Sequence, residues 1–168
     1  VEAKSEPTNP RQSFREADIP LVLSAINKPL IKQMSLFSLG SGLRLSEVTH
    51  TEWTDIEFDS GHTMKLIATM KKGFEDDTAW LNYAENIQGF VHVQNKLNFK
   101  VKGNEDRRVP LSIEVIELLC DLWPDETVFE ISSYIWGKRY SKDYLSHSVS
   151  AVLRKLGYPK FIYTFHSF

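Results

Sequence analysis

The sequence predicts an α+β fold that is mostly helical, with a small antiparallel sheet near its middle. Three observations predict it. Near both ends of the chain, apolar residues recur every three or four positions, which is the spacing of one helix face. Between residues 56 and 111 the spacing changes to alternation, and turn residues such as Gly103 and Asn104 interrupt it. The chain has 168 residues, of which 42% are hydrophobic and 25% charged, values typical of one globular domain.

The beginning of the chain is expected to be a linker or tail over residues 1–12, because this stretch is polar and rich in proline. One domain then covers residues 13–168. Its first helix should reach about Asn27, and two starts are compatible with the sequence. They are Ser13 with Glu16, which would form a capping box, and Asp18 followed by Pro20 in the first turn.

The second helix should open at Pro29, since proline is favoured in the first turn of a helix. Gly40 and Gly42 are expected to end it, because glycine readily adopts the backbone conformation that terminates helices. A third, short helix should begin near Leu45 and stop near Trp53.

Short extended segments are expected next. Residues 56–58 and 90–93 alternate as strands do, and residues 64–70 are expected to form a strand as well. Residues 71–89 are polar and irregular, so we interpret them as an insertion or a long loop. A hairpin should follow, with arms at 99–101 and 109–111 and its turn at Gly103-Asn104-Glu105.

Two helices should close the domain. Ser112 can cap the first, and Pro124 stops it. Residues 125–140 show no clear pattern. Either Ser141 or Asp143 begins the second, an amphipathic helix that presents Leu145, Val149, Val152 and Leu156 on one face and stops at Gly157.

Composition bears on which classes of protein are compatible with this chain. The net charge of −2 counts against a stand-alone nucleic-acid binder, although a local cluster of cations can still make a binding face. No apolar run approaches the roughly 20 residues of a membrane helix, so no membrane partner is expected. The histidines and Cys120 lack the spacing of metal ligands, so no metal is expected, and Cys120 should be a buried structural thiol.

Arg44 is the first candidate functional residue, because it stands at a helix start directly after two glycines. A guanidinium there lies near free backbone N–H groups, and both favour a phosphate. Glu47 shares the helix face and could orient the guanidinium. Taken alone, an ordinary surface ion pair is the simpler interpretation.

Lys102 and His166 are two further candidates. Lys102 lies in the turn of the predicted hairpin, where a lysine can reach into a groove and donate a proton. His166 follows Thr164, a possible helix cap, and a histidine there can hydrogen-bond a phosphate or act as an acid or base. Taken alone, each is more simply a solvated side chain.

Together these segments resemble the tyrosine recombinase (phage-integrase-type) family, over roughly residues 13–168. SGLRLSEV at 41–48, followed by WTDI at 53–56, resembles the first arginine box of that family. KGN at 102–104 with RVPL at 108–111 resembles its β-hairpin with the catalytic lysine. LRKLG at 153–157 and the stretch 163–168 resemble the run into its second box, His-x-x-Arg, of which His166-Ser167-Phe168 is present.

The resemblance implies a mechanism that needs no metal or cofactor, since a tyrosine attacks the scissile phosphate and holds it as a 3′-phosphotyrosyl link. By resemblance, Arg44 would clamp the non-bridging oxygens, Lys102 would protonate the leaving 5′-oxygen and His166 would assist at the phosphate. Glu47 would support them. The implied partner is a double-stranded DNA recombination site, bound in the cytoplasm by a homotetramer of the full-length protein.

The second arginine and the tyrosine nucleophile of the family would follow Phe168. We therefore expect this chain to be the front part of a catalytic domain that cannot cleave DNA by itself. All six of its tyrosines precede His166, and none is assigned as the nucleophile.

Further cations are expected to contact DNA phosphates, although solvated surface is an equal interpretation for the second group. They are Lys100, Arg107 and Arg108 on the hairpin, and Lys138, Arg139 and Lys142 before the last helix. Two alternatives stay open. One is a non-catalytic DNA-binding remnant or regulator with the same fold, and the other is a protein-interaction module whose contact patch is Trp80, Leu81 and Tyr83 in the 71–89 segment.

Overall fold

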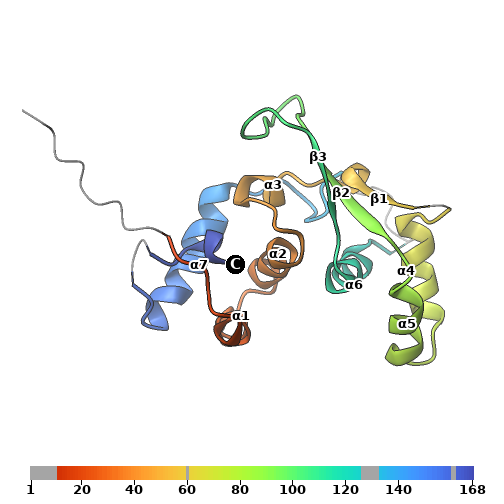
Figure 1. The fold of residues 1–168 in the computed structure, drawn as a ribbon, viewed down its shortest axis with the longest axis horizontal. Helices are drawn as coiled ribbons and strands as arrows, with labels where there is room; N and C mark the ends of the chain where they lie inside the picture. The colour runs from red at the N-terminus through yellow and green to blue at the C-terminus, as the bar shows by residue number, and fades with distance from the viewer. Residues whose placement is uncertain (1–10, 60, 126–132, 160–161) are drawn as a thin grey trace, which may run out of the picture.

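The computed structural model describes residues 11–59, 61–125, 133–159 and 162–168, and in them helices flank a small sheet (Figure 1). The helices are α1 (Ile19–Ala25), α2 (Pro29–Ser41), α3 (Leu45–Thr49), α4 (Met64–Gly73), α5 (Asp77–Ala84), α6 (Ile113–Leu122) and α7 (Lys142–Lys155), with 3-10 turns at Glu16–Asp18, Trp53–Asp55 and Phe165–Ser167. The strands are β1 (Ile56–Phe58), β2 (Gly89–Val93) and β3 (Arg107–Pro110). The predicted α+β class is confirmed.

The sheet is antiparallel, with β2 between β1 and β3. Gly89, Val91 and Val93 of β2 are buried and alternate with less buried neighbours, so one face of the sheet covers the core. Helix α6 lies against both α2 and α4 and so joins the two helical groups seen in Figure 1. The loop 94–106 between β2 and β3 projects beyond the sheet.

Local signals placed several helix ends correctly. Pro20 stands in the first turn of α1, which confirms the later of the two predicted starts, although the helix ends at Ala25. Pro29 opens α2, and Gly42 ends it with a left-handed φ of 66°. The side chain of Ser112 accepts a hydrogen bond from the first turn of α6, as predicted, and that of Ser141 does so for α7, which confirms the first of the two predicted starts.

The prediction that Gly40 ends α2 is wrong, because this residue lies inside the helix. A Cβ atom at Gly40 would lie 2.4 Å from Cγ2 of Val115 and 2.8 Å from Oγ of Ser112. Glycine at this position therefore allows α2 and α6 to approach closely, which is a packing role rather than a terminating one.

The prediction of a strand over residues 64–70 is also wrong, since these residues lie in α4. Oγ1 of Thr63 accepts a hydrogen bond from the N–H of Leu66 and caps the helix. Met64, Ile67 and Ala68 are buried at helical spacing. A short apolar run carries too few residues to separate this period from alternation, and packing against α6 decides for the helix.

The segment 71–89 is not an irregular loop, because it contains the whole of α5, and Asp76 caps that helix. Trp80 is only 1% exposed, packs against Phe74 and donates from Nε1 to Oε1 of Glu117 at 3.2 Å. The proposed contact patch for a protein partner therefore has its largest side chain in the core.

The predicted hairpin has the correct turn but different arms. Gly103 and Asn104 adopt positive φ values of 88° and 55°, as a turn requires. Residues 99–101 form no strand, because β3 pairs directly with β2 in a register that opposes Val93 and Arg107. Residues 94–106 therefore lie outside the pairing of β2 with β3, and β3 ends at Pro110.

The two ends of the described chain lie side by side. The N–H of Gln12 donates to the carbonyl of Ile162 at 3.1 Å. Phe14 packs against Tyr158, Tyr163 and Phe168. Arg11 and Gln12, which we expected to belong to a linker, are thus placed against the domain.

The structure also bears on the predictions for Cys120, for residues 125–140 and for membrane-spanning segments. Cys120 is buried, as predicted, and burial raises the pKa of its thiol to about 11. Within 125–140, residues 126–132 lie outside the described residues, while Tyr134 bridges to Glu52. None of the helices in the described ranges is long and apolar enough to cross a membrane.

Candidate functional site

Arg44 is held at the start of α3 by the local backbone. Gly42 ends α2, and Arg44 then occupies the N-cap position with an extended backbone. Its N–H donates to Oε2 of Glu47 at 2.8 Å, which closes the first turn of α3. The side chain of Arg44 is 50% exposed, so its guanidinium is available to a ligand at the surface.

Glu47 is the buried acid beneath this arginine, with a side chain only 3% exposed. Its carboxylate accepts two hydrogen bonds from Arg107 of β3, from Nη1 to Oε1 at 2.9 Å and from Nη2 to Oε2 at 2.6 Å. The Nη1 atom of Arg44 lies farther away, 3.7 Å from Oε1. Glu47 thus supports Arg44 chiefly by accepting a hydrogen bond from the backbone N–H of Arg44. The side chain that pairs most closely with the Glu47 carboxylate is Arg107.

Lys102 comes to Arg44 from the loop between β2 and β3. Nη1 of Arg44 donates to the carbonyl oxygen of Lys102 at 3.5 Å, and the lysine side chain is exposed. The two residues are 58 positions apart, so only the folded loop brings them together.

His166 completes the group from the other end of the domain. Its N–H donates to Oγ1 of Thr164 at 3.3 Å, at the start of the last 3-10 turn, where the sequence predicted a cap. Burial lowers the pKa of His166, and the positive charges of Arg11, Arg44 and Lys102 lower it further. The imidazole is therefore neutral at neutral pH, and the structure brings the three predicted residues to one surface.

Arg11 is a member of this group that sequence reasoning missed. The prediction placed it in a linker, and no local motif marks it. It lies near His166 because the segment containing Gln12 and Phe14 packs against residues 158–168, a contact between the two ends of the chain. Such a contact leaves no signal in one sequence.

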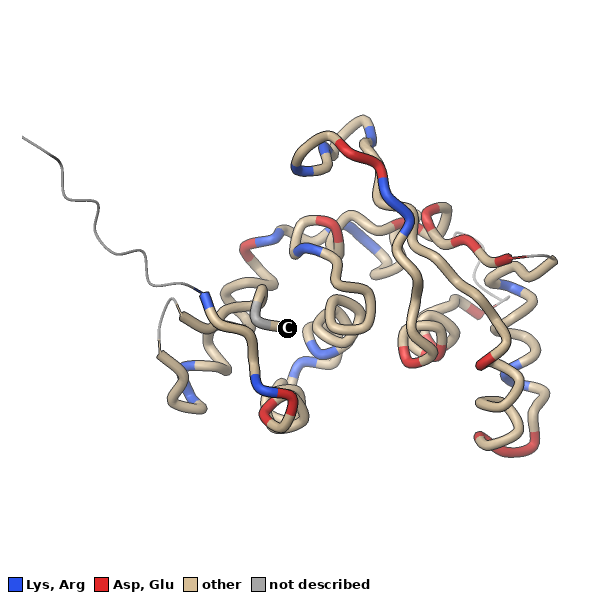
Figure 2. The backbone as a smooth tube through the Cα atoms, in the orientation of Figure 1, with Lys and Arg blue, Asp and Glu red and all other residues tan. Residues whose placement is uncertain are grey.

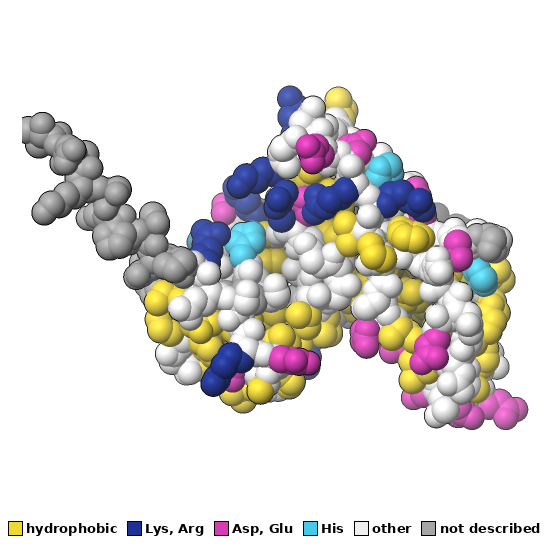
Figure 3. Space-filling view, in the orientation of Figure 1, with side chains coloured by type: hydrophobic (Ala, Val, Ile, Leu, Met, Phe, Trp, Pro, Cys, Tyr) yellow, Lys and Arg dark blue, Asp and Glu magenta, His cyan; other side chains and the backbone are white. Residues whose placement is uncertain are grey.

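Basic side chains gather on one face in spite of the net charge of −2. Figure 3 shows a band of lysine and arginine side chains across the molecule below the projecting loop, with a histidine within it. Figure 2 shows acidic residues at the turn beside α5 and others on the projecting loop and near α3, next to basic ones. The band of exposed cations can still attract a polyanion, because the field at one face matters more than the net charge.

The other predicted phosphate contacts have varied surroundings. Nε of Arg108 lies 3.1 Å from Oε2 of Glu57, and its guanidinium stands 4.5 Å from the ring of Phe90. Nζ of Lys138 lies 5.1 Å from the ring of Tyr140, and Arg139 is near enough to His50 to lower its pKa, after the larger effect of burial. The exposed residues in this set are Lys100, Arg108, Lys138, Arg139 and Lys142.

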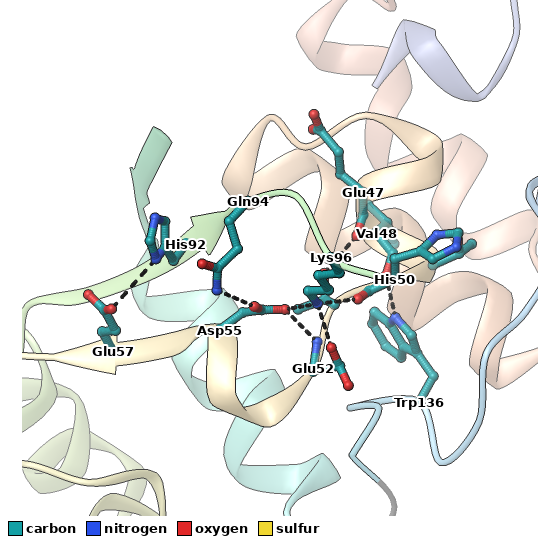
Figure 4. Close-up of polar contacts among 12 residues, drawn as sticks. Glu47, Val48, His50, Glu52, Asp55, Glu57, His92, Gln94, Lys96 and Trp136 are labelled. Carbon is teal, nitrogen blue, oxygen red and sulfur yellow. Dashed lines mark hydrogen bonds and ion pairs between the residues drawn. The ribbon is translucent and has the colours of Figure 1, made fainter. Parts of the chain in front are cut away.

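A second charge cluster surrounds Lys96 at the beginning of the loop, and in it Asp55 is buried while Lys96 and Glu52 are partly exposed (Figure 4). Its Nζ donates to the carbonyl of His50 at 2.8 Å and pairs with the carboxylates of Glu52, at 2.8 Å, and Asp55. The hydrogen bond from Lys96 is the main reason that the pKa of Glu52 is lowered. Lys96 is thus satisfied by protein groups and holds the loop to the turn after α3.

In the part of the chain that the structure describes, no three His, Cys, Asp or Glu side chains gather as metal ligands. The groups that face solvent at the site are instead the cations Arg11, Arg44 and Lys102 and the imidazole of His166. They can donate hydrogen bonds to an anion and stabilise negative charge on it.

Comparisons with known proteins support the fold. No protein-family model and no curated protein sequence matches this chain. Among solved structures, the XerA recombinase matches with a TM-score of 0.51 and 14% identity, over 94% of this chain and 47% of that protein. The XerH site-specific recombinase, solved in a pre-cleavage complex with its difH substrate, matches with a TM-score of 0.51 and 14% identity, over 99% of this chain and 42% of that protein. The chain therefore has a tyrosine recombinase-like fold and spans less than half the length of either protein.

Proposed function

We propose that this chain is part of a site-specific DNA recombinase that breaks and rejoins strands through a 3′-phosphotyrosyl intermediate. The observation that supports it best is the meeting of Arg44, Lys102 and His166 at one exposed surface, from three distant parts of the chain. Each residue alone has a simpler explanation. Their convergence on a basic face of this fold has no such simple explanation, because cations that repel one another favour an anionic ligand when they are held close together.

The roles follow from the chemistry of each group. Arg44 presents a fork of donors to the non-bridging oxygens of a phosphate. Lys102 is the proton donor to the leaving 5′-oxygen. His166, neutral at neutral pH, forms a hydrogen bond to the phosphate and can accept or donate a proton there.

The partner is double-stranded DNA, and the full-length protein would act on it as a homotetramer in the cytoplasm. For the chain alone, binding should be weak and should fall steeply as salt rises, because cation–phosphate contacts release counterions. Fluorescence anisotropy with a labelled duplex at low and moderate salt measures this. R44A and K102A should each weaken binding and lower the salt slope by about one. K72A, on the exposed part of α4, is the matched control and should change neither. Absence of any binding at low salt would overturn the proposal.

The 168 residues should not form a covalent adduct with DNA, since none of their tyrosines follows His166. A nicked suicide substrate of the recombination site traps any phosphotyrosyl product, which denaturing gel electrophoresis detects. We expect no adduct with this chain and an adduct with the full-length protein. DNA binding without an adduct in both cases would instead favour a non-catalytic regulator with this fold.

A further inference from the structure

The loop that carries Lys102 is tied to the protein at both of its ends. At the first end, Lys96 is bound by Glu52, Asp55 and the carbonyl of His50 (Figure 4). At the second end, Arg107 makes its two hydrogen bonds with Glu47. All of these partners belong to α3, which Arg44 caps at its start, or to the turn that follows it.

Contacts within the loop make it a folded unit. Oδ1 of Asn95 accepts from the N–H of Val101 at 2.8 Å, and its Nδ2 donates to Oδ1 of Asn104. Val101 is buried, and the ring of Phe99 stacks on His50 with centroids 4.6 Å apart. The position of Lys102 is therefore set by where the two ends of the loop are fixed.

We infer that Arg107 is a positioning residue that holds Lys102 in place relative to Arg44, and not a phosphate contact. The inference rests on the proposed function and adds a residue to it. Both Nη atoms of Arg107 are engaged by Glu47, whose side chain is almost fully buried. A phosphate that recruited Arg107 would leave that carboxylate buried without its partner, which is unfavourable.

Arg108, the next residue, is the matched control. It carries the same charge on the same strand, but its side chain is 56% exposed and its ion pair is with the exposed side chain of Glu57. Loss of Arg108 removes one cation from the surface and leaves the attachment of the loop unchanged.

A double-mutant cycle on duplex affinity separates positioning from direct contact. R107Q and K102A should each raise the dissociation constant for the duplex. Because both changes act through Lys102, the increase in the double variant should be smaller than the product of the two single increases, by at least about threefold. R108Q with K102A should give the simple product. Multiplicative effects of R107Q and K102A would overturn the inference.

Hydrogen exchange on the DNA-free protein gives a second readout. R107Q should speed exchange of the amides of Val101 and Asn104, which the folded loop protects, whereas R108Q should not. Unchanged exchange in R107Q would also overturn the inference. If the wild type binds no DNA, the proposed function fails, and exchange alone decides whether Arg107 fixes the loop. If R107Q unfolds, R107K replaces it, since lysine keeps the charge and loses the two-point contact.

Discussion

Replacing Lys96 by methionine tests whether the cluster at the start of the loop stabilises the fold. The ammonium of Lys96 serves two carboxylates and one carbonyl, and its side chain is 20% exposed. Asp55 is buried and would keep, among the described residues, its hydrogen bonds from the N–H of Glu52, at 2.8 Å, and from Gln94, at 3.2 Å. Removing one partner of a buried ion pair costs about 3–5 kcal/mol. Because Glu52 can regain water, we expect about 3 kcal/mol for K96M, the lower end of that range.

Urea denaturation followed by circular dichroism measures this loss of unfolding free energy. K71M is the matched control, because Lys71 is 23% exposed but pairs with Asp121 and Glu117, which are more accessible to water. It should lose no more than about 1 kcal/mol. Equal losses for K96M and K71M, both below about 1 kcal/mol, would refute the argument that burial makes the Lys96 cluster important.

The pH dependence of the unfolding free energy is a second measurement of the role of Lys96. The pKa of Glu52 is lowered mainly by its hydrogen bond from Lys96, so the folded protein binds the proton less readily than the unfolded chain. Stability from this group is full above the unfolded pKa of about 4.3 and is lost as pH falls through the lower folded value. K96M should therefore lose less additional stability than the wild type between about pH 5 and pH 3. An unchanged difference between the two proteins over that range would contradict the cause assigned to the shift.

Two further predictions follow. G40A should destabilise the protein by about 1–3 kcal/mol in urea denaturation, because the new Cβ would collide with Val115, whereas G73A, with open space around it, should not. Duplex affinity should rise as pH falls through the pKa of His166, because protonation adds a cation that a phosphate stabilises; burial and then the neighbouring cations lower this pKa, so the rise lies below the range of an ordinary histidine. H166Q should remove that rise, and its persistence in H166Q would assign it to another group.

The sequence predicted those parts of the fold that depend on local chemistry. Pro29, Ser112 and Ser141 each act within one turn of a helix, so their signals survive without knowledge of the fold. The errors occurred where tertiary contacts decide. Residues 64–70 have an apolar pattern too short to fix a period, and Gly40 has the same identity whether it ends a helix or lets another helix approach.

The residues of the candidate site likewise fall into those that local sequence marks and those that only tertiary contacts reveal. Arg44, Lys102 and His166 could be proposed from the sequence because they sit in recognisable segments, and all three are exposed in the structure. Arg11 and Lys96 could not, because their importance comes from partners far away in the chain. For Arg107 the sequence predicted a phosphate contact, and the positioning role that we infer depends on its contact with Glu47, which only the fold shows.

The exposed cations of the candidate site and the buried acids beneath them affect the stability of the fold differently. An exposed cation contributes little to stability, so Arg44 and Lys102 can be placed for a ligand at small cost to the fold. Holding such cations together against their repulsion requires buried acids that fix the backbones from which they project. Glu47 does this for Arg44 through its N–H and for the loop through Arg107, while Asp55 fixes the same loop through Lys96. Buried carboxylates thus hold the segments from which the exposed cations project.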